Sequence, residues 1–258
     1  TRVSSSAASD VYKRQKKVEE ISNISHFDEI CSMLPFEKKD IYLIGGATRS
    51  LLSDNHENKD IDVVIPELDD RTVDKILDKY DSAKYYQAYK SISFELGDFE
   101  FQINSFRKDV APSGRHSKIA NALSIKEDSL RRDFTFNSIY INLIGEVFDF
   151  YSGVEHFKNN YLKFIFDPIV QIQKDYLRAI RYIRFLSLFE NTKTFPADLE
   201  AIMLLSKNIT DFVKEKKISQ ELNKIYKMPF PKNTISFLKE NNEPVSYTHL
   251  RAHETVGN

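Results

Sequence analysis

Two carboxylates one residue apart, Asp60 and Asp62, are the side chains of this 258-residue chain whose type and spacing most directly indicate chemistry. They lie in the run Asp60-Ile-Asp-Val-Val-Ile65, whose apolar content predicts a strand. Side chains alternate across a strand, so we expect both carboxylates on one face, with Cα atoms roughly 7 Å apart and the apolar residues in the core. Paired hard carboxylates suit Mg²⁺ bridged to the phosphates of a nucleotide.

A Gly-Gly pair, Gly45 and Gly46, follows the apolar run Ile41–Ile44 and precedes this strand. Glycine lets the backbone approach a ligand closely, and the helix that the pair opens would present N–H groups to phosphate oxygens. Each half alone is weak evidence, because Gly-Gly before a helix is usually a turn and Asp-x-Asp is about as often a solvated surface. The apolar residue between the aspartates and the closeness of the two elements favour a site.

The elements that must position these residues form two units. Helical periodicity covers 16–34, 47–52 and 70–80, and strands are expected at 41–44, 60–65, 83–96 (one or two pieces) and 99–106. Gly97-Asp98 predicts a hairpin, and Lys108–Lys118 predicts a mobile loop. After Asp167 the pattern predicts helices only, at 169–189, 197–206, 208–227 with a break, and 232–240.

Three charged motifs lie further along the chain. On their own residues, Arg131, Arg132 and Asp133 are most simply a surface charge cluster at a helix start, although arginines also bind phosphate. The segment 169–189 is most simply an amphipathic helix with an ordinary pair between Asp175 and Arg178. Arg184 falls on the rim of its apolar face, so it should need a buried partner.

Several motifs in order resemble those of one family. Gly-Gly-Ala-Thr-Arg49-Ser-Leu-Leu with Lys-Asp60-Ile-Asp62, then Arg-Arg-Asp-Phe-Thr-Phe-Asn137, Asp149 to Gly153, Asp167-Pro and Asp175-Tyr-Leu-Arg178 are similar to the tRNA nucleotidyltransferase and bacterial poly(A) polymerase family. That family lies within the DNA polymerase beta-like nucleotidyltransferases. The resemblance covers about residues 36–242. Several motifs at family-like spacing are far more specific than one.

The resemblance implies an α+β fold: a nucleotidyltransferase head with a small mixed or antiparallel sheet and flanking helices (16–166), followed by an all-α neck (167–244). It implies that Asp60 and Asp62 hold two Mg²⁺ ions, one activating an RNA 3′ hydroxyl and the other steadying the pyrophosphate. It assigns Asp175 and Arg178 to the edge of the incoming base, in place of a template. The nucleotide-binding set that it implies is Gly45, Gly46, Arg49, Arg132, Asp133, Asn137, Asp175, Arg178 and Arg181.

The chain also departs from the family pattern. Ser50 stands where Asp is usual, Lys174 replaces Glu, and Lys217 replaces Arg in the segment Lys217-Ile-Ser-Gln-Glu-Leu. Gln102 occupies the position of a third carboxylate, and Glu100, two residues away on the same face, is the alternative ligand. These departures motivate a second hypothesis, a catalytically weakened protein that binds nucleotide or RNA.

Composition indicates a soluble protein, and we expect it in the cytoplasm. The chain has 37 Lys and Arg against 38 Asp and Glu, a net charge of −1, so RNA contact would need local patches such as 107–118 and 178–184. No apolar run approaches membrane-spanning length, and a single cysteine excludes an internal disulfide. Residues 1–15 and 245–258 resemble translated sequencing-adapter read-through, and we expect a native chain that continues into a helical body beyond the neck.

The sequence therefore predicts a template-independent RNA nucleotidyltransferase that acts on CTP and ATP and on the 3′ end of tRNA or another RNA. CCA addition to tRNA is the first choice. Poly(A) addition and CC-only or A-only addition share these motifs, so they stay open, as does the oligomeric state.

Overall fold

The computed structural model describes residues 16–20, 27–53, 59–110 and 118–241, which divide into two compact units. The first contains residues up to Asp109 with 119–132 and 136–154, and the second contains 133–135 and the chain from Glu155 onward, with Val110 and Lys118. The predicted domain limits at 166 and 167 stay a prediction. The two ends predicted to be artefactual lie outside the described residues.

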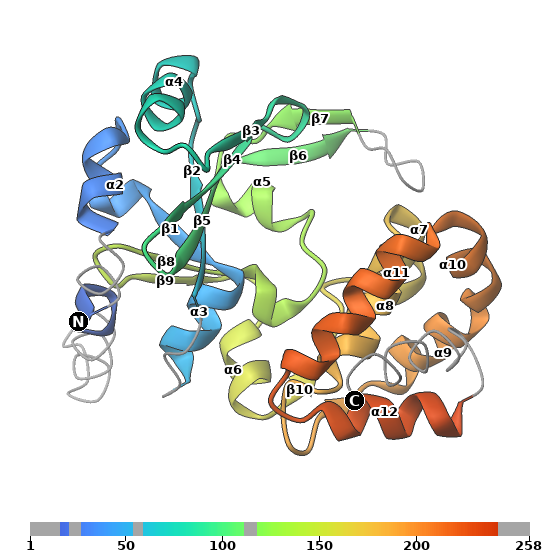
Figure 1. Ribbon diagram of the computed structural model, residues 1–258. Helices are drawn as coiled ribbons and strands as arrows, with labels where there is room; N and C mark the ends of the chain where they lie inside the picture. Colours follow the sequence, from blue (N-terminus) through green and yellow to red (C-terminus); the bar gives the residue numbers. More distant parts are fainter. Residues whose placement is uncertain (1–15, 21–26, 54–58, 111–117, 242–258) are drawn as a thin grey trace, which may run out of the picture. The chain divides into compact units, whose positions relative to one another are not determined.

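A seven-stranded sheet in the order β3-β4-β5-β2-β1-β8-β9 forms the centre of the first unit (Figure 1). Every neighbouring pair in it is antiparallel except β2 with β5, which run parallel. The predicted mixed sheet is thereby confirmed. Its strands are β1 (Tyr42–Ile44), β2 (Asp60–Ile65), β3 (Lys84–Tyr86), β4 (Ser91–Leu96), β5 (Phe99–Ser105), β8 (Ile139–Asn142) and β9 (Val147–Asp149).

One face of this sheet is covered by α2 (Phe27–Met33) and by the end of α4 (Asp70–Lys79). Phe27 stacks on Phe101 with ring centroids 5.8 Å apart, and Tyr80, which ends α4, stacks on Phe94 at 4.6 Å. The helix begins where predicted because the Asp69 side chain accepts a hydrogen bond from the Thr72 backbone N–H at 2.8 Å. This packing turns the apolar side chains of β2, β4 and β5 inward.

The opposite face of the sheet is divided between apolar and polar residues. Ile44, Val64, Phe106, Ala122 and Tyr140 form a buried cluster on it. Asp60 and Asp62 lie on this same face of β2. Ile61 and Val63, which alternate with them, are buried on the other face. The expected alternation of β2 is therefore confirmed.

A two-stranded sheet, β6 (Arg107–Val110) with β7 (Lys118–Asn121), follows β5. The predicted loop is wrong at both of its ends, because a polar run can form strand when it pairs with another strand. The centre of that loop, residues 111–117, lies outside the described residues. The chain then forms α5 (Ile125–Ser129) and the short 3₁₀ helix η3 (Thr135–Ser138).

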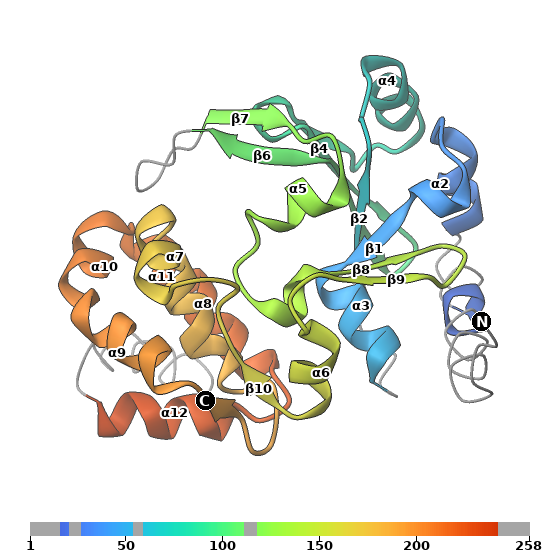
Figure 2. The ribbon, with the colours of Figure 1, turned by 180° about the vertical axis from the view of Figure 1, so that it is seen from behind.

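Helices dominate the second unit, with α8 packed beside α11 (Figure 2). The expectation of helices only is wrong at β11 (Lys193–Thr194), which pairs with β10 (Tyr161–Leu162). An aromatic core of Phe134, Phe164, Tyr182 and Phe185 holds α8 in place. The helices are α6 (Gly153–Lys158, which begins in the first unit), α7 (Pro168–Lys174), α8 (Leu177–Phe185), α9 (Pro196–Leu204), α10 (Ser206–Phe212), α11 (Glu215–Asn223), η4 (Lys224–Lys227) and α12 (Pro231–Glu240).

The predicted helix 169–189 is two helices. Asp175 has extended backbone angles (φ −157°, ψ 105°) and separates α7 from α8. Its Oδ1 accepts a hydrogen bond from the Leu177 backbone N–H at 3.0 Å. This bond caps α8 and takes the place of a continuous helix through Asp175. None of the helices described here is long and apolar enough to span a membrane.

Candidate active site

The carboxylates of β2 lie on one face of the sheet, next to the third strand that the sequence pointed to. Asp60 is exposed and Asp62 is half-buried. In the parallel register of β2 with β5, Asp60 is paired with Glu100 and Asp62 with Gln102. The strand geometry that the sequence predicted is present, and the role of these residues stays a prediction.

Gly45 brings the start of α3 (Gly45–Leu52) against the same carboxylate. Its φ is +62°, in the left-handed region, and a Cβ at this position would lie 3.0 Å from Asp62 Oδ2. Only glycine meets both conditions without strain. The helix begins two residues earlier than predicted, so its first backbone N–H groups lie beside Asp62.

Arg49 on α3 contacts a second residue of the predicted set. Its Nη1 donates to Asn137 Oδ1 at 2.5 Å, and its guanidinium lies 5.9 Å from the centre of the Phe136 ring. Asn137 is 5% exposed. The fold thus joins the Gly-Gly motif to the Arg-Arg-Asp-Phe-Thr-Phe-Asn motif, 88 residues apart.

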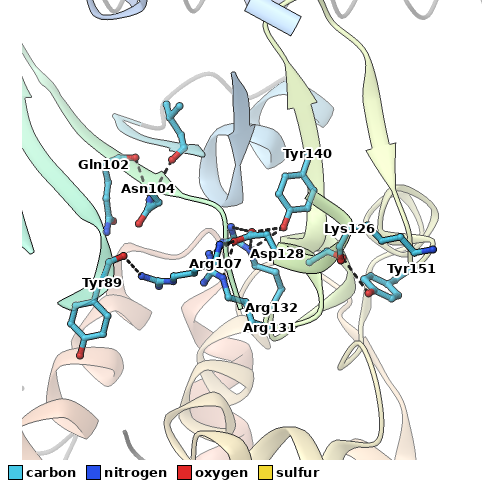
Figure 3. Close-up of polar contacts among 12 residues, drawn as sticks. Tyr89, Gln102, Asn104, Arg107, Lys126, Asp128, Arg131, Arg132, Tyr140 and Tyr151 are labelled. Atoms are coloured by element: carbon cyan, nitrogen blue, oxygen red, sulfur yellow. Dashed lines mark hydrogen bonds and ion pairs between the residues drawn. The ribbon is translucent and has the colours of Figure 1, made fainter. Parts of the chain in front are cut away.

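Arg132 belongs to a buried cluster around Asp128, a carboxylate that we did not single out from the sequence (Figure 3). Asp128 is fully buried, and its Oδ2 accepts from Arg132 Nη2 at 2.7 Å and from the Tyr140 hydroxyl at 2.7 Å. Its Oδ1 accepts from Arg131 Nε at 2.9 Å and from the Arg107 backbone N–H at 3.1 Å. The simpler prediction of a surface charge cluster is wrong here, because the arginines are folded inward around one carboxylate.

The electrostatics of this cluster follow from burial and from its charges. Burial alone would raise the pKa of Asp128, but the guanidinia of Arg132 and Arg131 hold it well below its usual value. Burial and the charge of Arg132 lower the pKa of Arg131 to about 10. The cluster is therefore a stable ionised group with more positive than negative charge.

In the second unit, Asp133 and Arg181 form an ion pair, with Nε–Oδ2 at 2.6 Å. Burial alone would lower the pKa of Arg181, but the carboxylates of Asp133 and Glu221 raise it above its usual value. Two residues of the predicted set are thus held against each other. Local sequence pattern does not indicate this pairing, because 48 residues separate Asp133 from Arg181.

Asp175 and Arg178 do not form an exposed helix pair. Arg178 is 6% exposed and donates to Gln171 Oε1 on α7, a contact that no motif indicated. Burial raises the pKa of Asp175. The simpler interpretation of a surface salt bridge is wrong, since Arg178 is buried and Asp175 is half-buried at the junction of α7 and α8.

Arg184 has the buried partner that the sequence predicted. Its Nε lies 2.9 Å from Glu221 Oε2, and Lys224 also contacts that carboxylate at 2.6 Å. Both Arg184 and Glu221 are largely buried.

Asp149, from the Asp-x-x-x-Gly segment, accepts from the backbone N–H groups of Gly153 and Val154 at 2.8 and 2.9 Å, and so caps α6.

Gln102 is held by hydrogen bonding beside the carboxylates. Its Nε2 donates to Ser91 Oγ on β4 at 3.1 Å. Among the residues that the structure describes, no three His, Cys, Asp or Glu side chains gather closely enough to hold a metal. The donors at Asp62 are the two aspartates with the neutral amide of Gln102 as neighbour, while Glu100, the alternative ligand, lies beside Asp60 on β5. Oxygen donors of this kind fit a hard divalent cation that keeps several waters.

The sequence is similar to those of one group of known proteins. Residues 41–163 match the family described as the Poly A polymerase head domain. The human mitochondrial CCA tRNA nucleotidyltransferase 1 is 30% identical over 197 residues, covering 73% of this chain and 44% of the relative. The CCA-adding enzyme of Bacillus pumilus is 32% identical over 189 residues, covering 70% and 44%.

Solved structures show the same fold. The CCA-adding enzyme of Bacillus stearothermophilus in complex with CTP has a TM-score of 0.63 at 21% identity, over 78% of this chain and 48% of that one. The Thermotoga maritima CCA-adding enzyme complexed with tRNA has a TM-score of 0.61 at 22% identity, over 78% and 46%. This chain spans less than half the length of the relatives described here.

Proposed function

We propose that this chain, which belongs to the tRNA nucleotidyltransferase and poly(A) polymerase family, transfers nucleotides from CTP and ATP to the 3′ end of an RNA without a template. The observation that carries the proposal is the meeting of Gly45 with Asp62. A left-handed glycine, the first turn of a helix and a strand carboxylate come together there, which suits a triphosphate with its cation.

Asp60 and Asp62 would hold the divalent cation, for which we propose Mg²⁺. When bound, such an ion lowers the pKa of the attacking hydroxyl and neutralises charge on the phosphates. Gln102 contributes no charge at this face.

We propose that Gly45, Gly46, Arg49 and Arg132 contact the triphosphate. The N–H groups at Gly45 and Gly46, at the positive end of α3, would donate hydrogen bonds to phosphate oxygens. Arg49, already held by Asn137, would supply a guanidinium fixed in one orientation. Arg132, held by Asp128, would supply a second, and an arginine fixed in this way loses little side-chain entropy on binding an anion.

We propose that a further set of residues, Asp133, Asp175, Arg178 and Arg181, serves the base and the ribose. Asp133 would contact the ribose, and Asp175 and Arg178 would hydrogen-bond the base edge, with Arg181 holding Asp133 in place. The contact of Arg178 with Gln171 supports this assignment, because it fixes the guanidinium on a helix start. Cytosine and adenine both offer an exocyclic amine to the carboxylate and a ring acceptor to the arginine.

CCA addition to tRNA is the form of this activity that we favour. The relatives are a CCA tRNA nucleotidyltransferase and a CCA-adding enzyme, and similar solved structures include complexes of CCA-adding enzymes with CTP, ATP and tRNA. Poly(A) addition remains the alternative, because the family that matches 41–163 is named for it. Since named relatives include mitochondrial enzymes, the cytoplasmic location stays a prediction.

The test is the incorporation of labelled CTP and ATP into a tRNA that ends before CCA. We expect Asp62→Asn and Asp60→Asn each to abolish incorporation, since each change removes a proposed metal ligand. The melting temperature of each variant should equal that of the parent, because the change lies on an accessible strand face. Asp98→Asn is the matched control, because that exposed carboxylate in the β4–β5 turn pairs only at the surface with Lys59. A doubly substituted Asp60/Asp62 protein that transfers as fast as the parent would disprove the proposal.

The second candidate function, a nucleotide- or RNA-binding protein without catalysis, is motivated by Gln102 and its hydrogen bond to Ser91. Gln102→Glu separates the two. An enzyme with an incomplete metal site should transfer faster with the new carboxylate, whereas a binding protein should stay inactive with Mg²⁺ or Mn²⁺ while still binding nucleotide.

A further inference from the structure

Asp128 contacts both Arg131 and Arg132. It lies in α5, before the Arg-Arg-Asp motif, and is fully buried. The helix that carries it is capped: Ser124 Oγ accepts from the Glu127 N–H at 3.3 Å, and Glu127 Oε2 accepts from the Leu123 N–H at 2.9 Å. The position of Asp128 is thus set by the backbone.

Both oxygens of Asp128 are used. The Oδ2 receives Arg132 and Tyr140, while Oδ1 receives Arg131 and the backbone N–H of Arg107. Tyr140 is itself buried in the apolar cluster on the same sheet face as Asp62. Asp128 therefore ties the two arginines to the sheet that bears the proposed metal ligands.

The positive charge of the arginines around Asp128 exceeds the negative charge of this carboxylate. Three guanidinia, those of Arg107, Arg131 and Arg132, interact with this single carboxylate. Their repulsion contributes to the lowered pKa of Arg131, for which burial is the larger cause. A second anion at the partly accessible arginines would relieve that repulsion.

From this geometry we infer that Asp128 is a positioning residue, which orients Arg131 and Arg132 so that they bind the triphosphate of the nucleotide. The inference rests on the proposed function. Arg132 contacts Asp128 through its Nε and Nη2, so it would contact the phosphate through the Nη1 side of the guanidinium. Arg131, fixed on the other oxygen, would contact the phosphates as a second oriented guanidinium.

The sign of the effect of Asp128→Asn distinguishes positioning from simple charge. Removing a negative charge beside the arginines should by itself tighten the binding of an anion. Loss of orientation should weaken it, and partners that orient metal ligands change affinity by about ten- to a hundredfold when they are replaced. We therefore expect CTP and inorganic triphosphate to bind about tenfold or more weakly to Asp128→Asn.

The experiment measures the Kd of CTP and of inorganic triphosphate for the parent, Asp128→Asn and Glu127→Gln. Glu127 is the matched control, because it is the neighbouring carboxylate in α5, pairs at the surface with Lys108, and as glutamine keeps an oxygen that can accept from the Leu123 N–H and preserve the helix cap. Its change should leave both affinities unaltered. An Asp128→Asn protein that is folded and binds either anion as tightly as the parent, or more tightly, overturns the inference.

Two further variants complete the design. In an Arg132→Lys background, Asp128→Asn should weaken triphosphate binding much less than in the parent, since Asp128 is inferred to act through Arg132. Additive effects of the two substitutions on the Kd would contradict the inference. Should Asp128→Asn fail to fold, Tyr140→Phe decides, because it removes one hydrogen bond to Asp128 and keeps the charge. Weaker triphosphate binding supports the inference and unchanged binding overturns it.

The outcome is separable from that of the proposed function. A parent that binds CTP and loses it on Asp128→Asn, yet transfers no nucleotide to RNA, would sustain the inference and refute the activity. A parent that transfers nucleotide, with an Asp128→Asn variant of equal affinity, would do the reverse.

Discussion

Gly45→Ala tests the structural feature on which the proposed site depends. The backbone there has φ +62°, and the new Cβ would lie 3.0 Å from Asp62 Oδ2. The left-handed conformation costs a non-glycine residue about 1–2 kcal/mol. The carboxylate must in addition move by a few tenths of an ångström to relieve the contact.

Gly97→Ala separates these two effects. Gly97, in the turn between β4 and β5, has φ +59°, and a Cβ there would meet nothing within 4 Å. Both substitutions should therefore lower the free energy of unfolding by a similar amount, about 1–2 kcal/mol, or a few degrees in Tm. Only Gly45→Ala should displace a proposed metal ligand.

The assay is the kcat/KM for incorporation of CTP into tRNA, with thermal unfolding measured on the same preparations. A misplacement of about 1 Å at a reacting centre can cost a hundredfold, so a shift of a few tenths should cost on the order of tenfold. If Gly45→Ala and Gly97→Ala have equal activity, the close approach of Gly45 to Asp62 has no part in the chemistry and the reasoning fails.

Two other predictions concern the second unit. Arg178→Ala should reduce the preference for CTP and ATP over UTP and GTP by about ten- to a hundredfold, each specific contact being worth about 1–3 kcal/mol, and an unchanged ratio of the four incorporation rates would return Arg178 to a structural role. Burial raises the pKa of Asp198 from 3.8 to about 6, although it accepts from the Phe164 N–H. Because the folded chain then keeps a proton that the unfolded chain has released, the free energy of unfolding should fall as the pH rises from about 4 to about 6. Urea unfolding across that interval should show this slope in the parent and a flatter profile in Asp198→Asn.

The local sequence pattern was sufficient to predict an element and its buried side chains where one face of the element is buried and the other is not. The strand Asp60–Ile65 has the bounds that its alternation predicts, and the turn at Gly97 joins β4 to β5 as expected. Arg184 could be assigned a buried partner from helical periodicity alone, because a charge at the rim of an apolar face cannot stay unpaired. The identity of that partner, Glu221, depends on tertiary packing.

Other features depend on contacts that a sequence does not display. Asp175 interrupts a helical pattern because its carboxylate caps the next helix, and the hydrophobic period continues across the break. Asp128 lies in a short run with Lys126 and Glu127, which looks solvent-exposed, yet it is fully buried because three elements converge on it. Such residues would be recognised from the sequence only by asking which charge could neutralise two adjacent arginines.

The parallel pairing of β2 with β5 also bears on how the chain reaches this fold. Asp60 and Glu100 are partners although 40 residues separate them, whereas β4 and β5 meet through a tight turn. The hairpin can therefore form early, and β2 must dock onto it later at a greater entropic cost. A slip of one residue in that docking would turn both aspartates into the apolar core and expose Ile61 and Val63. The two carboxylates proposed to bind the metal thus also disfavour a slipped strand register during folding, because that register would bury them.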